Sequence, residues 1–263
     1  MSTPSPYAIE TEGLTRRFGD LVAVDGVSLR IPKGRLYGFL GLNGAGKTTT
    51  IRILTTLLPP SEGRAMLWGH DVVEESLAVR HLVGLVSDET SESQSTWTAR
   101  EYLAYFARIR RIPHPADEVE HMLDDVGLDV RFRSKLIGTY STGMKRRVEI
   151  ARALMGHPKV LFLDEPTRGL DLPAKREMWA LLRRLAATEN VTTFLSSHDA
   201  QEIRTLCSEI SVIRQGRLVY TGPTHNLGAD IDAFEERLIA LLTVGDEPVG
   251  SLHPVRSRVS TNP

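Results

Sequence analysis

Residues 41–48 have the sequence GLNGAGKT, which satisfies every fixed position of the phosphate-binding pattern GxxxxGK[ST]. Glycines in such a loop let backbone N–H groups close around the dense negative charge of a triphosphate. Lys47 adds a positive charge that can reach the β- and γ-phosphates, and the Thr48 hydroxyl can ligate Mg²⁺. The apolar stretch 36–40 precedes the loop and the helical stretch 48–58 follows it. This order predicts a strand, a nucleotide-binding loop and a helix.

The composition is that of an ordinary soluble globular protein. Of 263 residues, 41% are hydrophobic and 25% are charged, and the formal net charge is −1. The near-neutral charge argues against nucleic acid as a partner. Cys207 is the only cysteine, which excludes an intrachain disulfide and favours a reducing compartment. Since neither a membrane-spanning run nor a secretory pattern is found, we expect a cytoplasmic protein.

Patterning along the chain divides it into regions of different character. Residues 7–40 alternate polar and apolar positions, residues 98–156 have helical patterns, and strands alternate with helices over 160–220. We therefore predict an α/β fold: a phosphate-loop core with a mainly parallel sheet, an N-terminal antiparallel β subdomain and an inserted α-helical subdomain at about 89–157. In the last region we expect strands at 160–164, 191–196 and 209–214, helices at 173–188 and 199–206, and a hairpin at 215–220.

The end of the chain carries a weaker signal. Residues 7–222 form the predicted nucleotide-binding domain, and residues 223–263 form a C-terminal extension. Within the extension, residues 232–242 fit one amphipathic helix. The last 15 or so residues, rich in proline, serine and arginine, predict a disordered tail.

Residues 160–165, VLFLDE, indicate a buried strand that ends in two acids. Because neighbouring strand residues point to opposite faces, Asp164 and Glu165 have different roles. Asp164 is the better partner for Mg²⁺, directly or through water. Glu165 is left to polarise an attacking water as a general base. A solvated acid pair is the common alternative for such a motif in isolation, and the phosphate loop shifts the balance towards catalysis.

Two further segments fit the same site. His198 follows the apolar stretch 191–195, and carboxyl ends of strands in such sheets converge on the ligand crevice. A histidine there can hydrogen-bond a γ-phosphate and align the water with its base. Ser141 and Gly143 lie where a helix begins near Met144, and a serine-capped helix start beside a glycine binds anions well. In isolation these would be an ordinary surface histidine and an ordinary helix cap.

The motifs and their order make the chain resemble an ATP-binding-cassette ATPase subunit over roughly residues 7–222. The resemblance implies ATP and Mg²⁺ as ligands, with Phe18 as the aromatic on which adenine stacks. It assigns nucleotide binding to Phe18, Asn43, Gly44, Ala45, Gly46, Lys47, Thr48, Thr49, Ser141 and Gly143. It assigns catalysis to Glu165, His198 and Lys47, and metal binding to Thr48, Asp164 and Asp88.

Residues 140–147, YSTGMKRR, are especially similar to the signature of exporter ATPases that pair with separate ABC-2-type permeases. Thr142 replaces the first glycine of the usual signature. The resemblance implies a head-to-tail homodimer in which Ser141 and Gly143 of one protomer contact the γ-phosphate held by the other. It also implies a subunit that lies on the inner face of the cell membrane and touches the membrane only through the permease.

One segment departs from the family pattern. The family's glutamine should follow the strand at residues 83–86. Counting forward from that strand places Asp88 at the position, whereas counting back from Trp97 favours Glu89; Gln94 fits neither count. We expect Asp88 to serve as the Mg²⁺ partner, and the alternative is that both acids are solvated and contact only the permease.

Other functions are less well supported by the sequence. A soluble cassette ATPase that acts on nucleic acid or in cofactor assembly is disfavoured by the near-neutral charge and the exporter-like signature. A GTPase is disfavoured because the chain has no NKxD base-reading motif. ATP binding without hydrolysis is disfavoured because Glu165 and His198 are both present. The transported substrate is not encoded here, since that selectivity lies in the permease.

Overall fold

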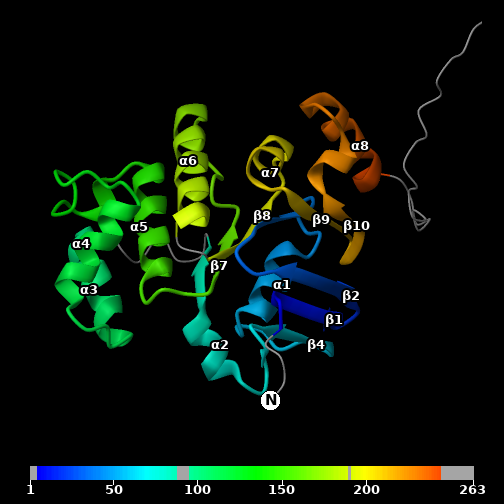
Figure 1. The fold of residues 1–263 in the computed structure, drawn as a ribbon, viewed down its shortest axis with the longest axis horizontal. Coiled ribbons are helices and arrows are strands. Elements are labelled where there is room, and N and C mark those ends of the chain that lie inside the picture. The colour runs from blue at the N-terminus through cyan, green and yellow to red at the C-terminus, as the bar shows by residue number, and fades with distance from the viewer. Residues whose placement is uncertain (1–4, 88–94, 189–190, 244–263) are drawn as a thin grey trace, which may run out of the picture.

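The structure, a computed structural model, describes residues 5–87, 95–188 and 191–243. This part of the chain contains a four-stranded sheet in the order β2-β1-β4-β5 and a six-stranded sheet in the order β10-β9-β3-β8-β7-β6. Figure 1 shows α6, α7 and α8 on the upper side of the molecule and α3, α4 and α5 together in a lobe at the left. The predicted α/β fold is confirmed.

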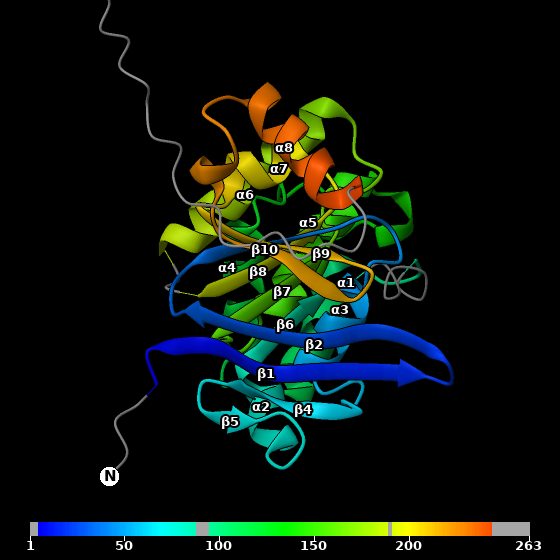
Figure 2. The same cartoon turned by 90° about the vertical axis from the view of Figure 1, so that its right-hand side faces the viewer.

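The four-stranded sheet is antiparallel, as predicted from the N-terminal alternation. β1 (Tyr7–Phe18) and β2 (Leu21–Pro32) form a long hairpin, and β4 (Glu62–Leu67) pairs with both β1 and the short β5 (His70–Asp71). Every second residue of β2 from Val27 onward is buried, because successive side chains point to opposite faces. Figure 2 shows β1 and β2 running across the front of the view.

The six-stranded sheet positions the candidate site. Its five parallel strands are β3 (Leu36–Leu40), β6 (Val83–Val86), β7 (Val160–Asp164), β8 (Thr192–Ser197) and β9 (Glu209–Arg214). β10 (Arg217–Pro223) closes one edge as the antiparallel partner of β9. The register places Leu40 beside Ser197 and Asp164 beside Ser196. The carboxyl ends of β3, β7 and β8 therefore meet at one edge.

One face of the parallel sheet has an aromatic core. Phe39, Phe162 and Phe194 are fully buried, and the rings of Phe39 and Phe162 lie 5.1 and 5.5 Å from that of Phe194. They pack in one cluster with Ile51 of α1 (Lys47–Leu54) and with apolar residues of the antiparallel sheet. The helix after the phosphate loop is thus held between the two sheets.

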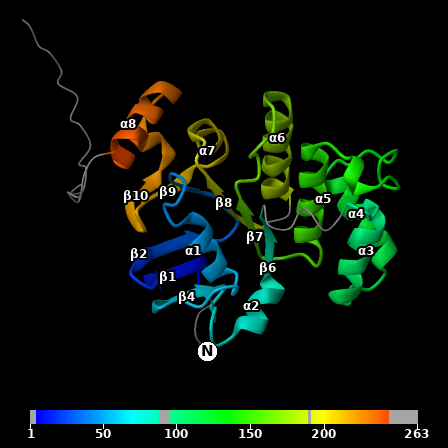
Figure 3. The same cartoon turned by 180° about the vertical axis from the view of Figure 1, so that it is seen from behind.

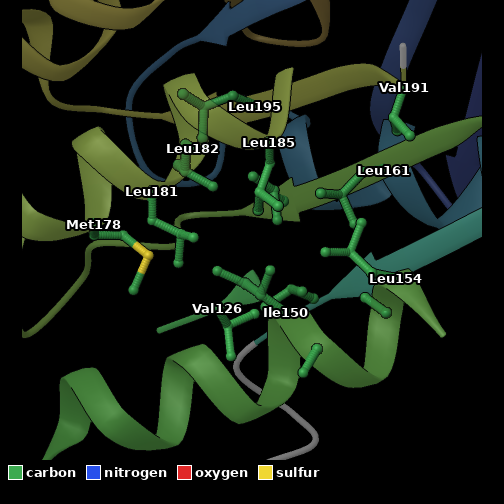
Figure 4. Packing of buried hydrophobic residues seen from close by; sticks show 14 of the residues in the cluster. Val126, Ile150, Leu154, Leu161, Met178, Leu181, Leu182, Leu185, Val191 and Leu195 are labelled. Atoms are coloured by element: carbon green, nitrogen blue, oxygen red, sulfur yellow. The ribbon is translucent and has the colours of Figure 1, made fainter. Parts of the chain in front are cut away.

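The opposite face has an aliphatic core. Leu161 of β7 and Leu195 of β8 alternate with the buried phenylalanines and join a second cluster. Figure 4 shows these leucines facing Ile150 of α5 (Thr142–Leu154). Leu181 and Leu185 of α6 (Leu172–Thr188) complete the same packing layer. Every residue of β7 and β8 is buried, and burial of both faces explains why β7 is apolar from Val160 to Leu163.

The helical lobe consists of α3 (Ala99–Ile109), α4 (Pro115–Asp125) and α5, and it lies to one side of the sheets in Figure 3. α3 begins with a capping box, in which the Thr98 side chain accepts a hydrogen bond from the Glu101 backbone and the Glu101 carboxylate accepts one from the Thr98 backbone. The start of the subdomain predicted at 89–157 lies outside the described residues.

The helix after the phosphate loop is shorter than predicted. It ends at Leu54, whereas the sequence pattern suggested residue 58. The Thr55 hydroxyl donates to the Ile51 carbonyl at 2.8 Å, and Thr56 adopts a left-handed conformation with φ of 64°. The chain thus leaves the helix before it reaches the two prolines at residues 59 and 60.

The helices α6, α7 and α8 match their predicted places within two residues, whereas α2 was not predicted. α7 spans Ala200–Leu206 and α8 spans Ile231–Thr243, while α2 is a short helix over Ser76–Leu82. In α8, Phe234, Leu238 and Leu241 are buried in the aliphatic core. The predicted C-terminal tail lies outside the described residues. None of the helices in the described ranges has both the length and the apolar character that a bilayer span requires.

Candidate functional site

The phosphate loop leaves β3 at Leu40 and turns into α1 between the two sheets. Two of its glycines are required by close backbone contacts. A Cβ atom on Gly46, which has φ of 109°, would lie 2.4 Å from the Ala23 carbonyl oxygen, and a Cβ on Gly41 would lie 2.5 Å from that of Ile213. The loop is therefore held tightly against its neighbours, and only glycine fits at these positions.

Lys47 is folded back over the mouth of the loop. Its side chain is only 5% exposed, and Nζ donates hydrogen bonds to the carbonyl oxygens of Gly41 at 2.8 Å and Leu42 at 3.2 Å. The same ammonium lies 3.2 Å from Glu165 Oε1. A phosphate entering the loop would offer oxygens that can replace these partners of a buried cation.

Thr48 and Asp164 meet at the edge where the strands end. Thr48 Oγ1 donates to Asp164 Oδ2 at 2.7 Å, and the Ser196 hydroxyl donates to the other carboxylate oxygen of Asp164. A hydroxyl and a carboxylate are the hard oxygen ligands that Mg²⁺ prefers. Across the described residues, no group of three or more His, Cys, Asp and Glu side chains could hold a metal. This fits Mg²⁺, which usually takes one or two protein ligands and leaves other positions to phosphate and water.

Glu165 lies between two basic side chains and has a strained backbone. Its φ is 48°, and His198 Nδ1 lies 3.2 Å from Oε2 while Lys47 lies at Oε1. Burial of the carboxyl group alone would raise the pKa of Glu165. The charge and hydrogen bond of Lys47, together with His198, outweigh burial and hold that pKa below its usual value. The side chain is therefore an ionised carboxylate at neutral pH, which is the form that a general base requires.

A pocket of about 680 Å³ joins these groups to the antiparallel sheet. Phe18 lies at its far end and is 44% exposed. The Arg16 guanidinium stacks on the Phe18 ring at 4.7 Å from the centroid and donates to the Pro59 carbonyl at 3.0 Å. The Arg16 guanidinium thus lies over one face of a ring that remains partly exposed. The predicted residues that line this pocket are Phe18, Asn43, Gly44, Gly46, Lys47, Thr48, Thr49, Asp164 and Glu165.

Three predicted nucleotide-binding residues do not line the pocket. Ala45 is buried, and its backbone N–H donates to the Leu42 carbonyl within the loop at 3.1 Å. Ser141 caps α5 by accepting a hydrogen bond from the Met144 backbone at 3.2 Å and is exposed, and Gly143 lies in the first turn of the same helix. The predicted metal ligand Asp88, like the alternative Glu89, lies outside the described residues.

Two residues at the site escaped the sequence interpretation. Ser196 binds Asp164 across the β7–β8 ladder, a contact that only the strand register reveals. Glu202 is a buried acid in α7 that approaches the end of β8. Its sequence signal is weak, because an acid in the first turn of a helix is common as a partner of the helix dipole.

Comparisons with known proteins agree on one family. The model of a family described as ABC transporter matches residues 24–168. The chain is 39% identical to the bacitracin transport ATP-binding protein BcrA of Bacillus licheniformis, over 83% of this chain and 71% of that protein. It is 37% identical to the daunorubicin/doxorubicin resistance ATP-binding protein DrrA of Streptomyces peucetius, over 90% and 72% respectively. It is 38% identical to the Nod factor export ATP-binding protein I of Burkholderia lata, over 83% and 72%.

Solved structures give the same fold. cbiO1 from Clostridium perfringens, part of the ABC transporter complex cbiONQ, has a TM-score of 0.80 at 26% identity and aligns over 90% of this chain and 96% of its own. A dimeric ATP-binding cassette in a post-hydrolysis state with ADP and Pi has a TM-score of 0.73 at 23% identity, over 82% and 98%. The second likeness shows the fold alone.

Proposed function

The chain belongs to the ABC transporter family, and from that premise we propose that it is the ATP-hydrolysing subunit of an exporter whose membrane path is a separate ABC-2-type permease. The observation that carries the proposal is the meeting of Lys47, Thr48, Asp164, Glu165 and His198 at one edge of the parallel sheet. The relative named for export of Nod factor supports the direction of transport.

ATP binding rearranges contacts that already exist in the pocket. The triphosphate takes the place of the Gly41 and Leu42 carbonyls as partner of Lys47, and backbone N–H groups of the loop bind its oxygens. Adenine stacks on the Phe18 ring, which remains partly exposed. Thr48 and Asp164 would hold Mg²⁺, which would supply positive charge against the phosphates.

Hydrolysis follows from the position of Glu165. When Lys47 turns towards the phosphates, the Glu165 carboxylate loses its closest cation and is free to accept a proton from the attacking water. His198, whose Nδ1 lies 3.2 Å from Glu165 Oε2, holds the base in place. The water oxygen bonds to the γ-phosphorus as the bond from that phosphorus to the β,γ-bridging oxygen breaks, so ADP and Pi are the products, and Glu165 then passes the proton to solvent.

The site is completed by a second copy of the chain. Ser141 and Gly143 sit at an exposed helix start that does not line the pocket of their own protomer. An exposed, capped helix N-terminus offers N–H groups and a partial positive charge to an anion. In a head-to-tail homodimer, this helix start closes over the γ-phosphate bound by the partner.

The permease binds the helical lobe. Trp97, Tyr105 and Ile109 are exposed around α3, and the rings of Trp97 and Tyr105 lie 5.5 Å apart. Leu136, which lies between α4 and α5, is also exposed and forms an isolated β-bridge with Thr98 at the start of α3. Aromatic and aliphatic side chains that gather at a surface mark a protein interface.

Asp88 contributes to the metal site in this proposal. An aspartate brings a full negative charge on a short arm, so its removal should weaken the hold on Mg²⁺. We expect Asp88→Ala to raise the Mg²⁺ concentration for half-maximal ATPase activity, and Glu89→Ala to raise it less. Superimposable Mg²⁺ titrations of Asp88→Ala and the wild type would remove Asp88 from the metal site.

The proposal is tested by co-expression with a candidate ABC-2-type permease from the same genome. The subunit should sediment with membranes only when the permease is present, and the sedimented complex should hydrolyse ATP. Tyr105→Ser with Ile109→Ser should return the subunit to the supernatant without loss of ATP binding. A subunit that stays in the supernatant with the permease present, or that purifies with nucleic acid, would contradict the proposal.

A further inference from the structure

A buried carboxylate lies directly behind the catalytic pair. Glu202 is 1% exposed and comes from the first turn of α7. Glutamate is almost never fully buried without partners, because removing the charged group from water is costly. The proposed hydrolysis gives Glu202 no role, so its burial needs another explanation.

Glu202 accepts hydrogen bonds from three separate parts of the chain. The Ser197 hydroxyl donates to Oε2 at 2.6 Å, and the Trp179 indole N–H of α6 donates to Oε1 at 3.2 Å. The Thr167 hydroxyl is a third partner. Ser197, Trp179 and Thr167 are themselves buried. The carboxylate is thus a common acceptor for segments that are far apart in sequence.

Two of those segments carry the catalytic residues. Ser197 immediately precedes His198, and Thr167 is two residues after Glu165. A pocket of about 130 Å³ is lined by all four of these residues and by Glu202. The third donor, Trp179, stands on α6, which is packed into the aliphatic core. One carboxylate therefore fixes both catalytic segments to a rigid helix.

Neighbouring charges keep the start of α7 in place. Asp199 caps α7 by accepting from the Glu202 backbone N–H at 3.0 Å, and its other oxygen binds Lys175 Nζ at 2.9 Å. Ser197 Oγ also accepts from the Asp199 backbone N–H at 3.0 Å. The Ser197 hydroxyl is therefore oriented, because its acceptor position is used by Asp199 and its proton points to Glu202.

We infer that Glu202 is a positioning residue that holds His198 at its distance from Glu165, acting through Ser197 on one side and Thr167 on the other. It touches neither nucleotide nor water. The inference rests on the proposed ATPase function. Removal of the Glu202 side chain should lengthen the 3.2 Å distance between His198 Nδ1 and Glu165 Oε2 and leave the loop around Lys47 unchanged.

A double-mutant cycle with His198 tests this inference. We expect Glu202→Ala to lower kcat roughly 30-fold while KM for ATP changes less than about threefold, because misplaced catalytic groups affect turnover rather than binding. In a His198→Ala background the same change should cost less than about fivefold, since its main target is already gone. Glu202→Gln keeps one acceptor oxygen but cannot accept from Trp179 and Ser197 on both sides of the group, so its loss of turnover should be smaller than that of Glu202→Ala without returning to the wild-type level.

Glu149 provides the matched control. It is a second buried acid, accepts from the Tyr102 hydroxyl at 3.2 Å and lies in α5. Glu149→Ala should lower kcat by the same factor in the wild-type background and in the His198→Ala background. The inference is overturned if Glu202→Ala shows the same equality, because its effect would then be general destabilisation.

The ATPase activity of the wild-type complex distinguishes failure of the proposed function from failure of the role inferred for Glu202. If the wild-type complex itself does not hydrolyse ATP, the proposed function fails. If it hydrolyses ATP and the cycle is additive, only the role of Glu202 fails. Should Glu202→Ala not fold, Ser197→Ala and Thr167→Val each remove one donor and enter the same cycle. Additive losses for both of these variants would equally overturn the inference.

Discussion

The two regions proposed to contact the γ-phosphate differ in how complete they are. At the phosphate loop, Lys47, Asp164 and Glu165 are mostly buried, Lys47 is paired with Glu165, and Asp164 accepts a hydrogen bond from Thr48. At the start of α5, Ser141 is exposed and bonded only to its own helix. The first region is preorganised within one chain, whereas the second has donors with no ligand in the same protomer. The difference indicates that one chain can bind ATP but two are needed to hydrolyse it efficiently.

The largest effect is expected when the general base Glu165 is removed from the phosphate-loop region, which is the complete one of the two. Glu165→Gln should leave ATP binding near normal and lower turnover by roughly 10²–10⁴-fold, because general base catalysis is lost while the phosphate loop is intact. ATPase assays of the transporter complex and nucleotide-binding titrations measure the two effects. Glu177→Gln, an exposed change on α6, is the control and should leave turnover within about twofold. Turnover of Glu165→Gln within tenfold of wild type would remove Glu165 from this role.

A second test acts on the incomplete region. Ser141→Arg places a bulky side chain at the exposed helix start, so it should prevent closure over the partner's nucleotide and lower turnover by about 10–100-fold. ATP binding by the single chain should be unaffected. Light scattering in the Glu165→Gln background should show an ATP-driven dimer that Ser141→Arg abolishes. Ser134→Arg, at another exposed serine of the lobe, should leave the dimer intact. An unchanged dimer in Ser141→Arg would mean that the site lies within one chain.

A smaller effect is expected at the base end of the pocket, which is more open than the phosphate end. Stacking of a base on an aromatic ring contributes about 1–3 kcal/mol, so Phe18→Ala should raise KM for ATP about tenfold. Arg16→Ala removes only the cation behind the ring and should raise KM about two- to threefold. Equal KM values for Phe18→Ala and the wild type would show that the base binds elsewhere.

The sequence predicted the complete region better than its supporting contacts. Lys47, Thr48, Asp164 and Glu165 each belong to a short string whose local structure fixes their place, so their meeting follows from strand order alone. Ser196 was missed as a partner of Asp164 because that contact depends on the register of two strands. Arg16 was not predicted to cover Phe18, since the direction of a long exposed side chain depends on Pro59, which is distant in sequence.

The fold shows the same limit at a larger scale. The alternation of strands and helices after residue 160 was sufficient to predict the parallel sheet, because hydrophobic periodicity is set locally. The end of α1 was missed, since Thr55 and Thr56 close the helix by a hydroxyl hydrogen bond and a left-handed turn that the pattern does not encode. Glu202 was also missed, because an acid near a helix start has the same local signal whether it caps the dipole or supports a site.

The smallest effect concerns the pH dependence of the complete region before and after ATP binds. In the free chain, Lys47 at 3.2 Å helps to hold the pKa of Glu165 below its usual value, although burial opposes this shift. A lowered pKa means that the base is lost only when the pH falls below the usual range for glutamate. Binding of ATP draws Lys47 away and brings a negative γ-phosphate near, and both changes favour the protonated form. The pKa of Glu165 should therefore be higher in the complex than in the free chain.

Because kcat/KM reports the free enzyme and kcat reports the complex, the acid limb of the kcat profile should lie at higher pH than the acid limb of the kcat/KM profile. Steady-state ATPase profiles at saturating Mg²⁺, with the titration of MgATP measured separately, give both limbs. Coincident limbs would mean that Lys47 keeps its contact with Glu165 during turnover, and the exchange of partners proposed for it would be wrong.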